Sequence, residues 1–429
     1  MATTVNCPGC AREISIGRAF TGERLECPDC QTILLLKVTA APSLDRPQTI
    51  LPPPPRFAHP PAPKDEAEID RLARAHLASW LDLSARELGA ALSLVENGQG
   101  YDTWQIPKAG PSFRTISAPK EELKRVQRRI LDRILYRIPV SNASHGFVPG
   151  RSIVTGARVH LEDAKEVYNL DLKDAFPSVD ATRVKHVFVR WAKIPLKHLG
   201  PHVEHAVVDR VVELLVRLVT HEGKLPQGGP TSGCLLNLAC LKLDKYVYRF
   251  LGRYPGDLRF TRYADDLTVS SRDTIPEEVR QGLQAVIRDC GFRVNPQKIR
   301  YLSKARNQNL EVTGLILEKG QVRIPPATLD RYRAILHQAA TAHELPDEKR
   351  LEVQSILAFV KMVYPALPGA IRKPFEAYAA KHVGRPPGPR KAFGLDLYRG
   401  ARPPAPEPAA PEPGALPAPA PEPPAPPTG

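Results

Sequence analysis

The chain has 429 residues, enough for two or three domains with substantial cores, which excludes a small scaffold held together by disulfides. It is 42% hydrophobic and 25% charged, and its 60 Lys and Arg exceed its 46 Asp and Glu to leave a net charge of +14. Most of this excess, +13, falls on residues 65–398. A basic folded body favours a polyanionic partner such as nucleic acid, although charge also serves solubility.

The sequence shows no sign of export or membrane insertion. The first ten residues lack the basic and apolar regions of a secretory signal. The most apolar stretch, residues 205–220, carries four charged residues and cannot span a bilayer. We therefore expect a cytoplasmic protein that does not associate with membranes.

Four cysteines near the N-terminus have the spacing of a tetrahedral zinc site. Cys7 and Cys10 form one CxxC pair, Cys27 and Cys30 form a second, and 16 residues separate the pairs. A unit of about 35 residues has too small a core to fold without metal. Residues 1–38 are therefore predicted to be a zinc ribbon with one structural Zn²⁺. A redox pair or surface thiols are the alternatives, and the ribbon's partner, nucleic acid or protein, stays open.

Proline marks two unfolded segments. Of the 46 Pro, 9 fall in residues 41–63 and 13 in residues 401–429. Segments this rich in proline do not build a packed core. Residues 39–64 are therefore predicted to be a linker and residues 399–429 a disordered tail. They flank a main body at 65–320 and a helical, basic region at 321–398.

The body begins with helices and a hairpin. Apolar spacing predicts one or two amphipathic helices in residues 66–93. Residues 101–117 have the pattern of a β-hairpin turning near Lys108, and residues 120–138 that of a basic helix.

Three later segments carry chemistry. An apolar strand ends at Asp171, a Gly-rich loop with the sequence LPQGGPTSG enters a helix, and a strand, turn and strand place Asp265 and Asp266 at the turn. Transfer of a phosphoryl group to a hydroxyl requires neutralisation of the phosphate and activation of the nucleophile, which two divalent ions achieve together. Mg²⁺ takes oxygen ligands, so converging carboxylates suit it. An Asp-Asp turn alone is weak evidence, and the combination is what indicates nucleotidyl transfer.

These segments resemble the motifs of reverse transcriptases. YADD, at residues 263–266, resembles the YxDD box and follows a DxxxxF element by about 95 residues, with LPQGGPTSG between them. The resemblance covers residues 65 to about 363 and implies an α+β right-hand polymerase with fingers, a ferredoxin-like palm and a helical thumb. It implies that Asp171, Asp265 and Asp266 are catalytic and, with Leu172, bind two Mg²⁺.

The resemblance also implies nucleotide-binding residues. Phe176 stands where the family places an aromatic gate that excludes a 2′-hydroxyl. Gln227 and Gly228 resemble the loop that supports the incoming nucleotide, and Lys108 and Arg114 the cations that grip its triphosphate, although solvated hairpin charges are a serious alternative. Lys298 resembles a lysine that protonates departing pyrophosphate.

Two short signatures are similar to those of retron reverse transcriptases, NAxxH before the palm and VTG after it. The residues that match them are Ala157 and His160, then Val312, Thr313 and Gly314. Gly156 departs from the first signature, where Asn is expected. The run HGFVPGRS at residues 145–152 is similar to reverse transcriptases generally and does not discriminate between them.

The retron resemblance implies an enzyme that binds a cognate structured noncoding RNA and copies part of it with deoxynucleotides. Synthesis begins at the 2′-hydroxyl of an internal guanosine and yields branched RNA–DNA, and several such enzymes act in antiphage defence with an effector protein. The zinc ribbon and the tail are not part of the minimal retron enzyme. A group II intron maturase, another bacterial defence enzyme and a noncatalytic nucleic-acid scaffold remain alternatives.

Overall fold

The computed structural model describes residues 65–107, 113–191 and 205–382, together with the backbone of four short strands near the N-terminus. The chain divides into two compact units, Met1–Pro60 and Pro61–Gly429. In the first unit, β1 (Thr3–Asn6) pairs antiparallel with β2 (Glu13–Ile16), and β3 (Arg24–Glu26) with β4 (Ile33–Leu35). The four cysteines of the predicted zinc site, the linker and the tail lie outside the described residues.

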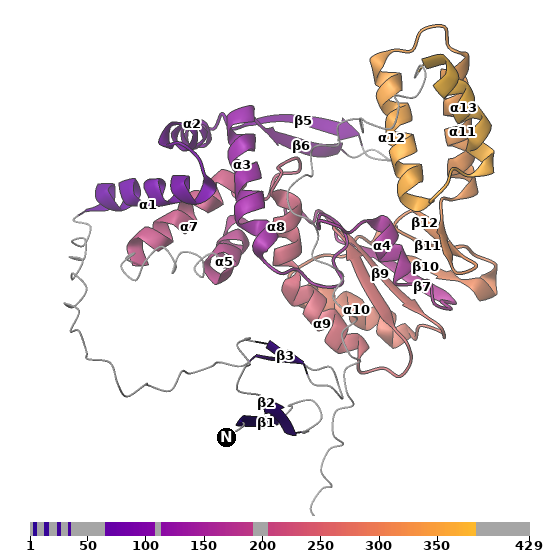
Figure 1. Cartoon of the computed structure of the whole chain (residues 1–429), viewed down its shortest axis with the longest axis horizontal. Coiled ribbons are helices and arrows are strands. Elements are labelled where there is room, and N and C mark those ends of the chain that lie inside the picture. The colour runs from indigo at the N-terminus through magenta and orange to yellow at the C-terminus, as the bar shows by residue number, and fades with distance from the viewer. Residues whose placement is uncertain are drawn as a thin grey trace, which may run out of the picture. The chain divides into compact units, whose positions relative to one another are not determined.

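Helices pack together at the start of the second unit, as the apolar spacing predicts. They are α1 (Glu66–Leu81), α2 (Ala85–Glu96), α3 (Glu121–Arg133) with the short η1 (Leu135–Arg137), and α7 (His205–Val219). Asp65 caps α1, and Ser84 and Glu87 form a capping box on α2, so both helices begin where free amide groups find side-chain acceptors. The hairpin of β5 (Tyr101–Pro107) and β6 (Phe113–Pro119) extends from these helices (Figure 1).

A four-stranded antiparallel sheet forms the centre of the unit. Its order is β10 (Arg300–Ser303), β7 (Glu166–Asp171), β9 (Asp266–Ser271) and β8 (Arg259–Tyr263). Because side chains alternate between the faces of a strand, the register places polar pairs such as Asp171 with Asp266 on one face and apolar pairs such as Leu170 with Leu267 on the other. The sheet thus has a polar face and an apolar face.

Helices α9 (Leu241–Leu251) and α10 (Glu277–Asp289) cover the apolar face. The ring of Tyr248 on α9 packs edge-on against Phe260 of β8 at 5.4 Å, and Gln284 on α10 donates to the Tyr168 hydroxyl of β7 at 2.9 Å. Figure 1 shows both helices beside strands β7 and β9. The apolar face is therefore buried, which leaves the polar face for chemistry.

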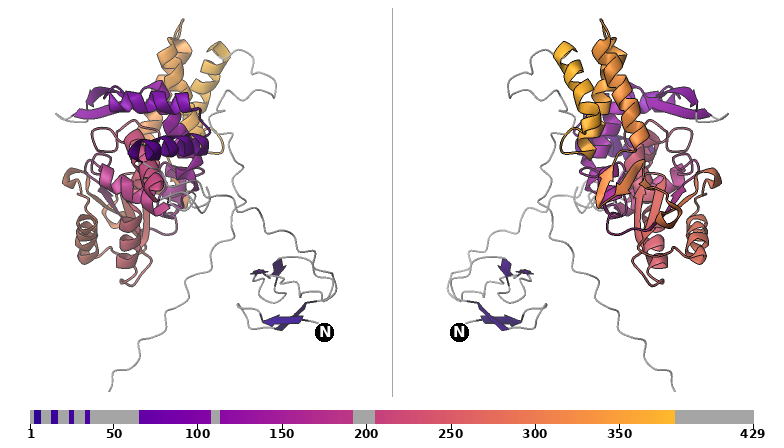
Figure 2. Two further views of the ribbon diagram at one scale, coloured as in Figure 1. Left: turned by 90° about the vertical axis from the view of Figure 1, so that its left-hand side faces the viewer. Right: turned by 90° about the vertical axis from the view of Figure 1, so that its right-hand side faces the viewer.

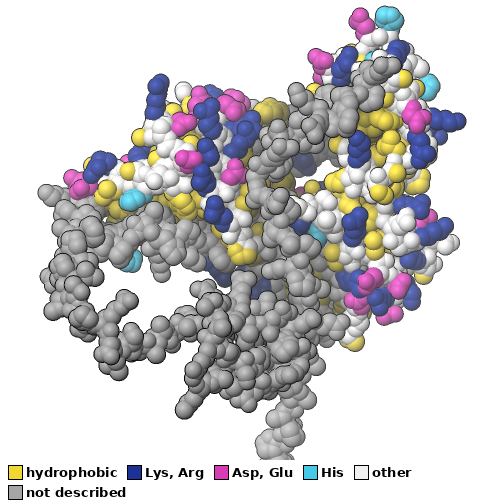
Figure 3. All heavy atoms as spheres, in the orientation of Figure 1, with side chains coloured by type: hydrophobic (Ala, Val, Ile, Leu, Met, Phe, Trp, Pro, Cys, Tyr) yellow, Lys and Arg dark blue, Asp and Glu magenta, His cyan; other side chains and the backbone are white. Residues whose placement is uncertain are grey.

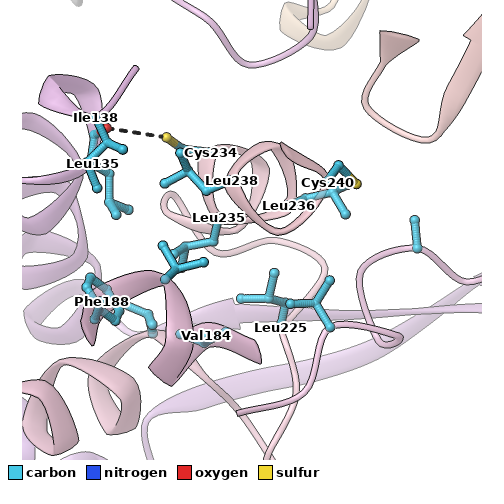
Figure 4. Close-up of a cluster of buried hydrophobic side chains, with 14 of the residues drawn as sticks. Leu135, Ile138, Val184, Phe188, Leu225, Cys234, Leu235, Leu236, Leu238 and Cys240 are labelled. Carbon is cyan, nitrogen blue, oxygen red and sulfur yellow. Dashed lines mark hydrogen bonds between the residues drawn. The ribbon is translucent and has the colours of Figure 1, made fainter. Parts of the chain in front are cut away.

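A second group of buried side chains joins α5 (Ala181–Trp191) to α8 (Ser232–Ala239). Phe188 and Val184 of α5 lie close to Leu235 of α8, and the Cys234 thiol approaches the Leu135 carbonyl at 3.8 Å (Figure 4). Helix α8 follows the Gly-rich loop, as expected from the sequence. This packing anchors the loop beside the central sheet.

The helix α4 (Ile153–Arg158) lies against the polar face of the sheet. His160 of the retron-like signature makes the contacts between them. His160, just after α4, is fully buried, and its two ring nitrogens lie 2.7 Å from the Ser270 hydroxyl and 2.8 Å from the Thr261 hydroxyl. Burial lowers the pKa of His160 to about 3, so its imidazole is neutral and joins β8 to β9 by hydrogen bonds. At Gly156, where the signature has Asn, a Cβ would lie 3.3 Å from the His145 side chain, so a larger residue would need that side chain to shift slightly.

The C-terminal part is a small sheet with a helical bundle. The strands are β11 (Leu310–Val312), β12 (Leu315–Glu318) and β13 (Gln321–Arg323), and the helices are α11 (Pro326–Thr341), α12 (Asp347–Val363) and α13 (Gly369–His382). These elements share a second core with α4, and the helices rise beside the sheet in both views of Figure 2. No helix among the described residues is long and apolar enough to cross a bilayer.

Candidate active site

The YADD sequence forms a tight hairpin between β8 and β9. Tyr263 pairs with Asp266, so Ala264 and Asp265 are the two turn residues. Ala264 has φ +56°, a conformation that favours glycine. Gly146 packs directly on this turn, where a Cβ would lie 2.8 Å from the Ala264 nitrogen. The surrounding structure therefore holds the hairpin in a strained form.

The three predicted catalytic acids come together at the end of the polar face. Asp171 lies directly opposite Asp266 across β7 and β9, and the Leu172 amide donates to the Asp265 carbonyl at 2.9 Å. Burial and then the charges of Asp265 and Asp171 raise the pKa of Asp266 to about 7. Burial also raises the pKa of Asp265. Negative charge is thus concentrated at this point.

Lys298 supplies the nearest positive charge. It is the last residue of the short helix η3 (Pro296–Lys298), and its Nζ lies 2.7 Å from Oδ2 of Asp171. Burial opposes its charged form, but the hydrogen bond to Asp171 raises the pKa of Lys298 overall. Asn295, which the sequence analysis did not single out, donates to Oδ1 of Asp171 at 3.3 Å. Both oxygens of Asp171 are therefore held in position.

No three His, Cys, Asp or Glu side chains in the described ranges are already arranged to hold a metal ion. The chemistry of the donors nevertheless fits Mg²⁺, because the nearby groups are carboxylate oxygens, and burial followed by the charge of neighbouring carboxylates raises the pKa of Asp265 and of Asp266. A divalent cation at this point would offset that repulsion.

Phe176, five residues after Asp171, has an aromatic partner that the sequence did not reveal. Its half-buried ring meets Phe147 edge-on, with centroids 6.1 Å apart. Phe147 is 51% exposed, has φ +56° and packs so closely on Gly233 of α8 that a Cβ there would lie 2.3 Å from its ring. The signal for Phe147 was the HGFVPGRS run, which is similar to reverse transcriptases generally but was not used to assign a role to Phe147.

The other predicted nucleotide-binding residues lie on the loop and the hairpin. The Gln227 carbonyl accepts from the Ser117 amide of β6 at 2.8 Å, and Gly228 has φ +128° with its Cα against the Ser117 carbonyl, where a Cβ would come within 2.9 Å. Only glycine suits that position. Arg114 is exposed on β6, and its charge lowers the pKa of Asp265 against the effect of burial. Lys108 lies outside the described residues.

The VTG residues form the turn between β11 and β12. Val312 is buried and pairs with Leu315, and Thr313 and Gly314 have φ of +47° and +80°, which is typical of a two-residue hairpin turn. The turn lines a cavity of about 290 Å³ together with Asp266 and Lys298. The structure thus places this signature beside Asp266.

A buried ion pair holds the catalytic hairpin from the apolar side. Arg262 of β8 is completely buried, and its Nε and Nη2 donate to the two carboxylate oxygens of Asp244 on α9, each at 2.8 Å. Its Nη1 donates to the Ala264 carbonyl and to the Asn237 side chain, each at 2.9 Å, and Nη2 also donates to Ser144. Burial opposes the charge of Arg262, but Asp244 raises its pKa above the ordinary value. All five donor positions are therefore directed at fixed acceptors.

Comparison with known proteins identifies the family. Residues 106–317 match the reverse transcriptase (RNA-dependent DNA polymerase) family. The chain is 35% identical to the retron Mx162 reverse transcriptase of Myxococcus xanthus over 70% of this chain and 68% of that protein. It is 34% identical to the retron Mx65 reverse transcriptase of the same organism over 70% of this chain and 72% of that protein. The chain belongs to the retron reverse transcriptases.

Family membership confirms several predictions for this retron reverse transcriptase. It is an RNA-directed DNA polymerase with a right-hand fold of mixed helix and sheet, and the reverse transcriptase domain uses a divalent metal. The retron Ec86 reverse transcriptase of Escherichia coli is 35% identical over 55% of this chain and 69% of its own. A solved structure of telomerase from Candida tropicalis aligns with 70% of this chain and 59% of its own chain, at 14% identity and a TM-score of 0.38.

In the retron enzyme we expect the substitution Arg262→Met to lower the free energy of unfolding by about 3–5 kcal/mol, because it leaves the Asp244 carboxylate buried without its partner. The double variant Arg262→Met/Asp244→Leu should lose less than the sum of the two single variants. Urea denaturation of the full chain measures both.

The control is Arg272→Met, since Arg272 is exposed and its pairs with Glu162 and Asp257 should contribute about 1 kcal/mol or less. If the Arg262 variant were no less stable than this control, the buried pair would not be what holds the hairpin.

Proposed function

We propose that this retron reverse transcriptase copies part of a structured noncoding RNA into branched RNA–DNA, beginning at a 2′-hydroxyl of that RNA, and that it acts in antiphage defence with an effector protein. The observation that carries the catalytic part is the juxtaposition of Asp171 with Asp266 across β7 and β9, with Asp265 in the turn between β8 and β9. The relatives, all retron enzymes, support the RNA part.

The acids act together on the phosphate. Asp171, Asp265, Asp266 and the Leu172 carbonyl are proposed to hold two Mg²⁺, which when bound neutralise the phosphate and lower the pKa of the attacking hydroxyl. Asn295 and Lys298 orient Asp171 through the hydrogen bonds described above. Lys298 is also proposed to give a proton to the departing pyrophosphate, because its Nζ is the cation nearest to the acids.

The incoming deoxynucleotide is proposed to lie between the hairpin and the palm. Arg114 and Lys108 would bind its triphosphate, since guanidinium and ammonium groups match phosphate oxygens. Gln227 and Gly228, held against Ser117 of the hairpin, would support it from the other side. Phe176 would fill the space that a 2′-hydroxyl needs, with Phe147 supporting its ring.

The thumb, α11 to α13, is proposed to grip the RNA duplex. Three of its cations, Arg333, Lys349 and Arg350, pair with acids three residues away on their own helices. Arg331 and Lys361 have no such pair with a described acid and are proposed to contact phosphates.

We expect the enzyme isolated from cells to carry a discrete RNA joined to DNA, and Asp265→Asn to abolish the DNA part. The loss of one ligand charge should slow nucleotide addition by about 10³-fold or more. Electrophoresis before and after ribonuclease treatment detects the branched product, and extension of a DNA primer on an RNA template measures the rate. Asp273→Asn, an exposed acid just beyond β9, is the control. Activity of Asp265→Asn close to that of this control would contradict the assignment of the acids.

For the gate, we expect Phe176→Val to raise ribonucleotide incorporation relative to deoxynucleotide by about tenfold or more, which corresponds to about 1.4 kcal/mol. The smaller side chain no longer fills the space of the 2′-hydroxyl. Single-turnover incorporation measures the ratio, and Phe176→Tyr should keep it. Unchanged discrimination in Phe176→Val would make Phe176 a packing residue only.

The zinc ribbon is proposed to bind one Zn²⁺ through Cys7, Cys10, Cys27 and Cys30. Elemental analysis of freshly purified protein should find about one zinc per chain, and Cys7→Ser/Cys27→Ser should lose it because two thiolate ligands are gone. Cys290→Ser, a partly exposed cysteine of the palm, should keep it. Zinc retained by the double variant would place the metal elsewhere.

A further inference from the structure

The outer face of α9 carries a row of cations around an aromatic ring. Lys242, Lys245, Tyr246 and Arg249 occupy positions i, i+3, i+4 and i+7 of the helix, which share one face, and all four are exposed. The only acid in α9, Asp244, points the other way into the pair with Arg262. The exposed face of this helix is therefore purely basic.

These cations differ from most others on the surface. Figure 3 shows Lys and Arg side chains spread over both the finger helices and the thumb, so positive charge alone marks no site. Many of those cations pair with carboxylates, as Arg133 does with Asp82 at 2.8 Å. Lys242, Lys245 and Arg249 form no ion pair with any acid in the described ranges, and the Lys242 Nζ lies instead 5.4 Å from the Tyr246 ring. Their charge is free to bind an external anion.

The row continues into a hollow. A cavity of about 310 Å³ lies between α5, the start of α9 and the residues after α10, and none of the described residues that line it is a carboxylate. Its polar lining comprises Lys242, Arg183, His186 and Arg190, over an apolar floor that includes Phe292. The Arg183 guanidinium donates to the Cys290 and Gly291 carbonyls, each at 3.2 Å, and stacks 4.7 Å from the Phe292 ring centroid. One cation of the hollow is thus fixed in place before any ligand arrives.

This surface lies on the side of the palm opposite the catalytic acids. Tyr248 and Asp244 of α9 contact Phe260 and Arg262 on the apolar face of the sheet, whereas Asp171 and Asp266 lie on the polar face. The outer face of α9 therefore points away from the sheet and cannot touch a template held at the acids. A ligand bound there contacts the enzyme outside the polymerase cleft.

We propose that this surface, formed by Lys242, Lys245, Tyr246 and Arg249 together with the adjoining hollow, binds the sugar–phosphate backbone of the structured RNA outside the cleft. Successive cations one helical turn apart suit the regularly repeated phosphates of a nucleic-acid strand, and Tyr246 and His186 offer rings on which an unpaired base can stack. The aromatic rings beside the unpaired cations favour RNA over an acidic protein as the ligand, because an unpaired base can stack on them. The inference rests on the RNA-templated function proposed above.

The test compares two triple variants of the full chain. Lys242→Ala/Lys245→Ala/Arg249→Ala removes the row, and Arg71→Ala/Arg125→Ala/Arg129→Ala removes three exposed finger cations that have carboxylate partners. The probe is the RNA recovered from the wild-type enzyme, transcribed in vitro. We expect the first variant to bind it at least about tenfold more weakly at 0.15 M salt and to reduce the slope of log affinity against log salt by about 2–3, since each phosphate contact contributes about 0.7–0.9. The control should change neither quantity appreciably.

Extension of oligo(dT) on poly(rA) separates this inference from the proposed function. The α9 variant should extend this unstructured template within about twofold of wild type, because the cleft is intact. The variant Lys242→Arg/Lys245→Arg keeps both positive charges and should bind the RNA with the wild-type affinity, because the charge of these side chains is what binds the phosphates. Unchanged RNA affinity and salt slope in the α9 variant, or an equal loss of poly(rA) extension, would overturn the inference. Failure of the wild-type enzyme to extend any RNA template would instead overturn the proposed function.

Discussion

The geometry of the active site depends on a guanidinium group buried behind it. Arg262 and Asp244 are both removed from water, at a cost that only full pairing offsets. Here the pairing is complete, because Arg262 also donates to Asn237, Ser144 and the Ala264 carbonyl. One side chain therefore joins the catalytic turn to α8, to α9 and to the segment that precedes α4. The strained φ of Ala264 persists because this network over-determines it.

Holding the turn has a direct consequence for the acids. The register of β7 with β9 places Asp171 opposite Asp266, and a shift of one residue would move one carboxylate to the apolar face. His160 bonds both β8 and β9 from the polar face, and Arg262 anchors β8 from the apolar face. The two contacts come from opposite sides of the sheet, so together they hold β8 against β9 and fix the turn that carries Asp265. Burial and then the charges of Asp265 and Asp171 raise the pKa of Asp266, and this scaffold keeps the carboxylates together against that cost.

The sequence predicts those features whose signals are local. Helices in residues 66–93, the hairpin after residue 100, the strand ending at Asp171 and the two strands that flank the turn at Asp265 all follow from periodicity, turn residues and motif spacing. Asn295, Phe147 and the Arg262 pair were missed, because their roles depend on which helix packs against which strand. Arg262 lies two residues before the turn, but a single arginine in a strand gives no indication from sequence alone that it is buried. Its burial becomes meaningful only once Asp244 is known to face it.

Helix α9 shows how one element serves two requirements. Its inner face contributes Asp244 to the network behind the catalytic turn, and its outer face presents cations without an accompanying acid. The geometry of a helix makes this separation possible, since Asp244 is adjacent in sequence to Lys245 and yet points in a different direction. An RNA held on the outer face would therefore be tethered to the same rigid helix that positions the acids. The enzyme would keep its own RNA bound while the strand in the cleft advances, because the contacts that retain the RNA and those that move the template lie on opposite sides of the palm.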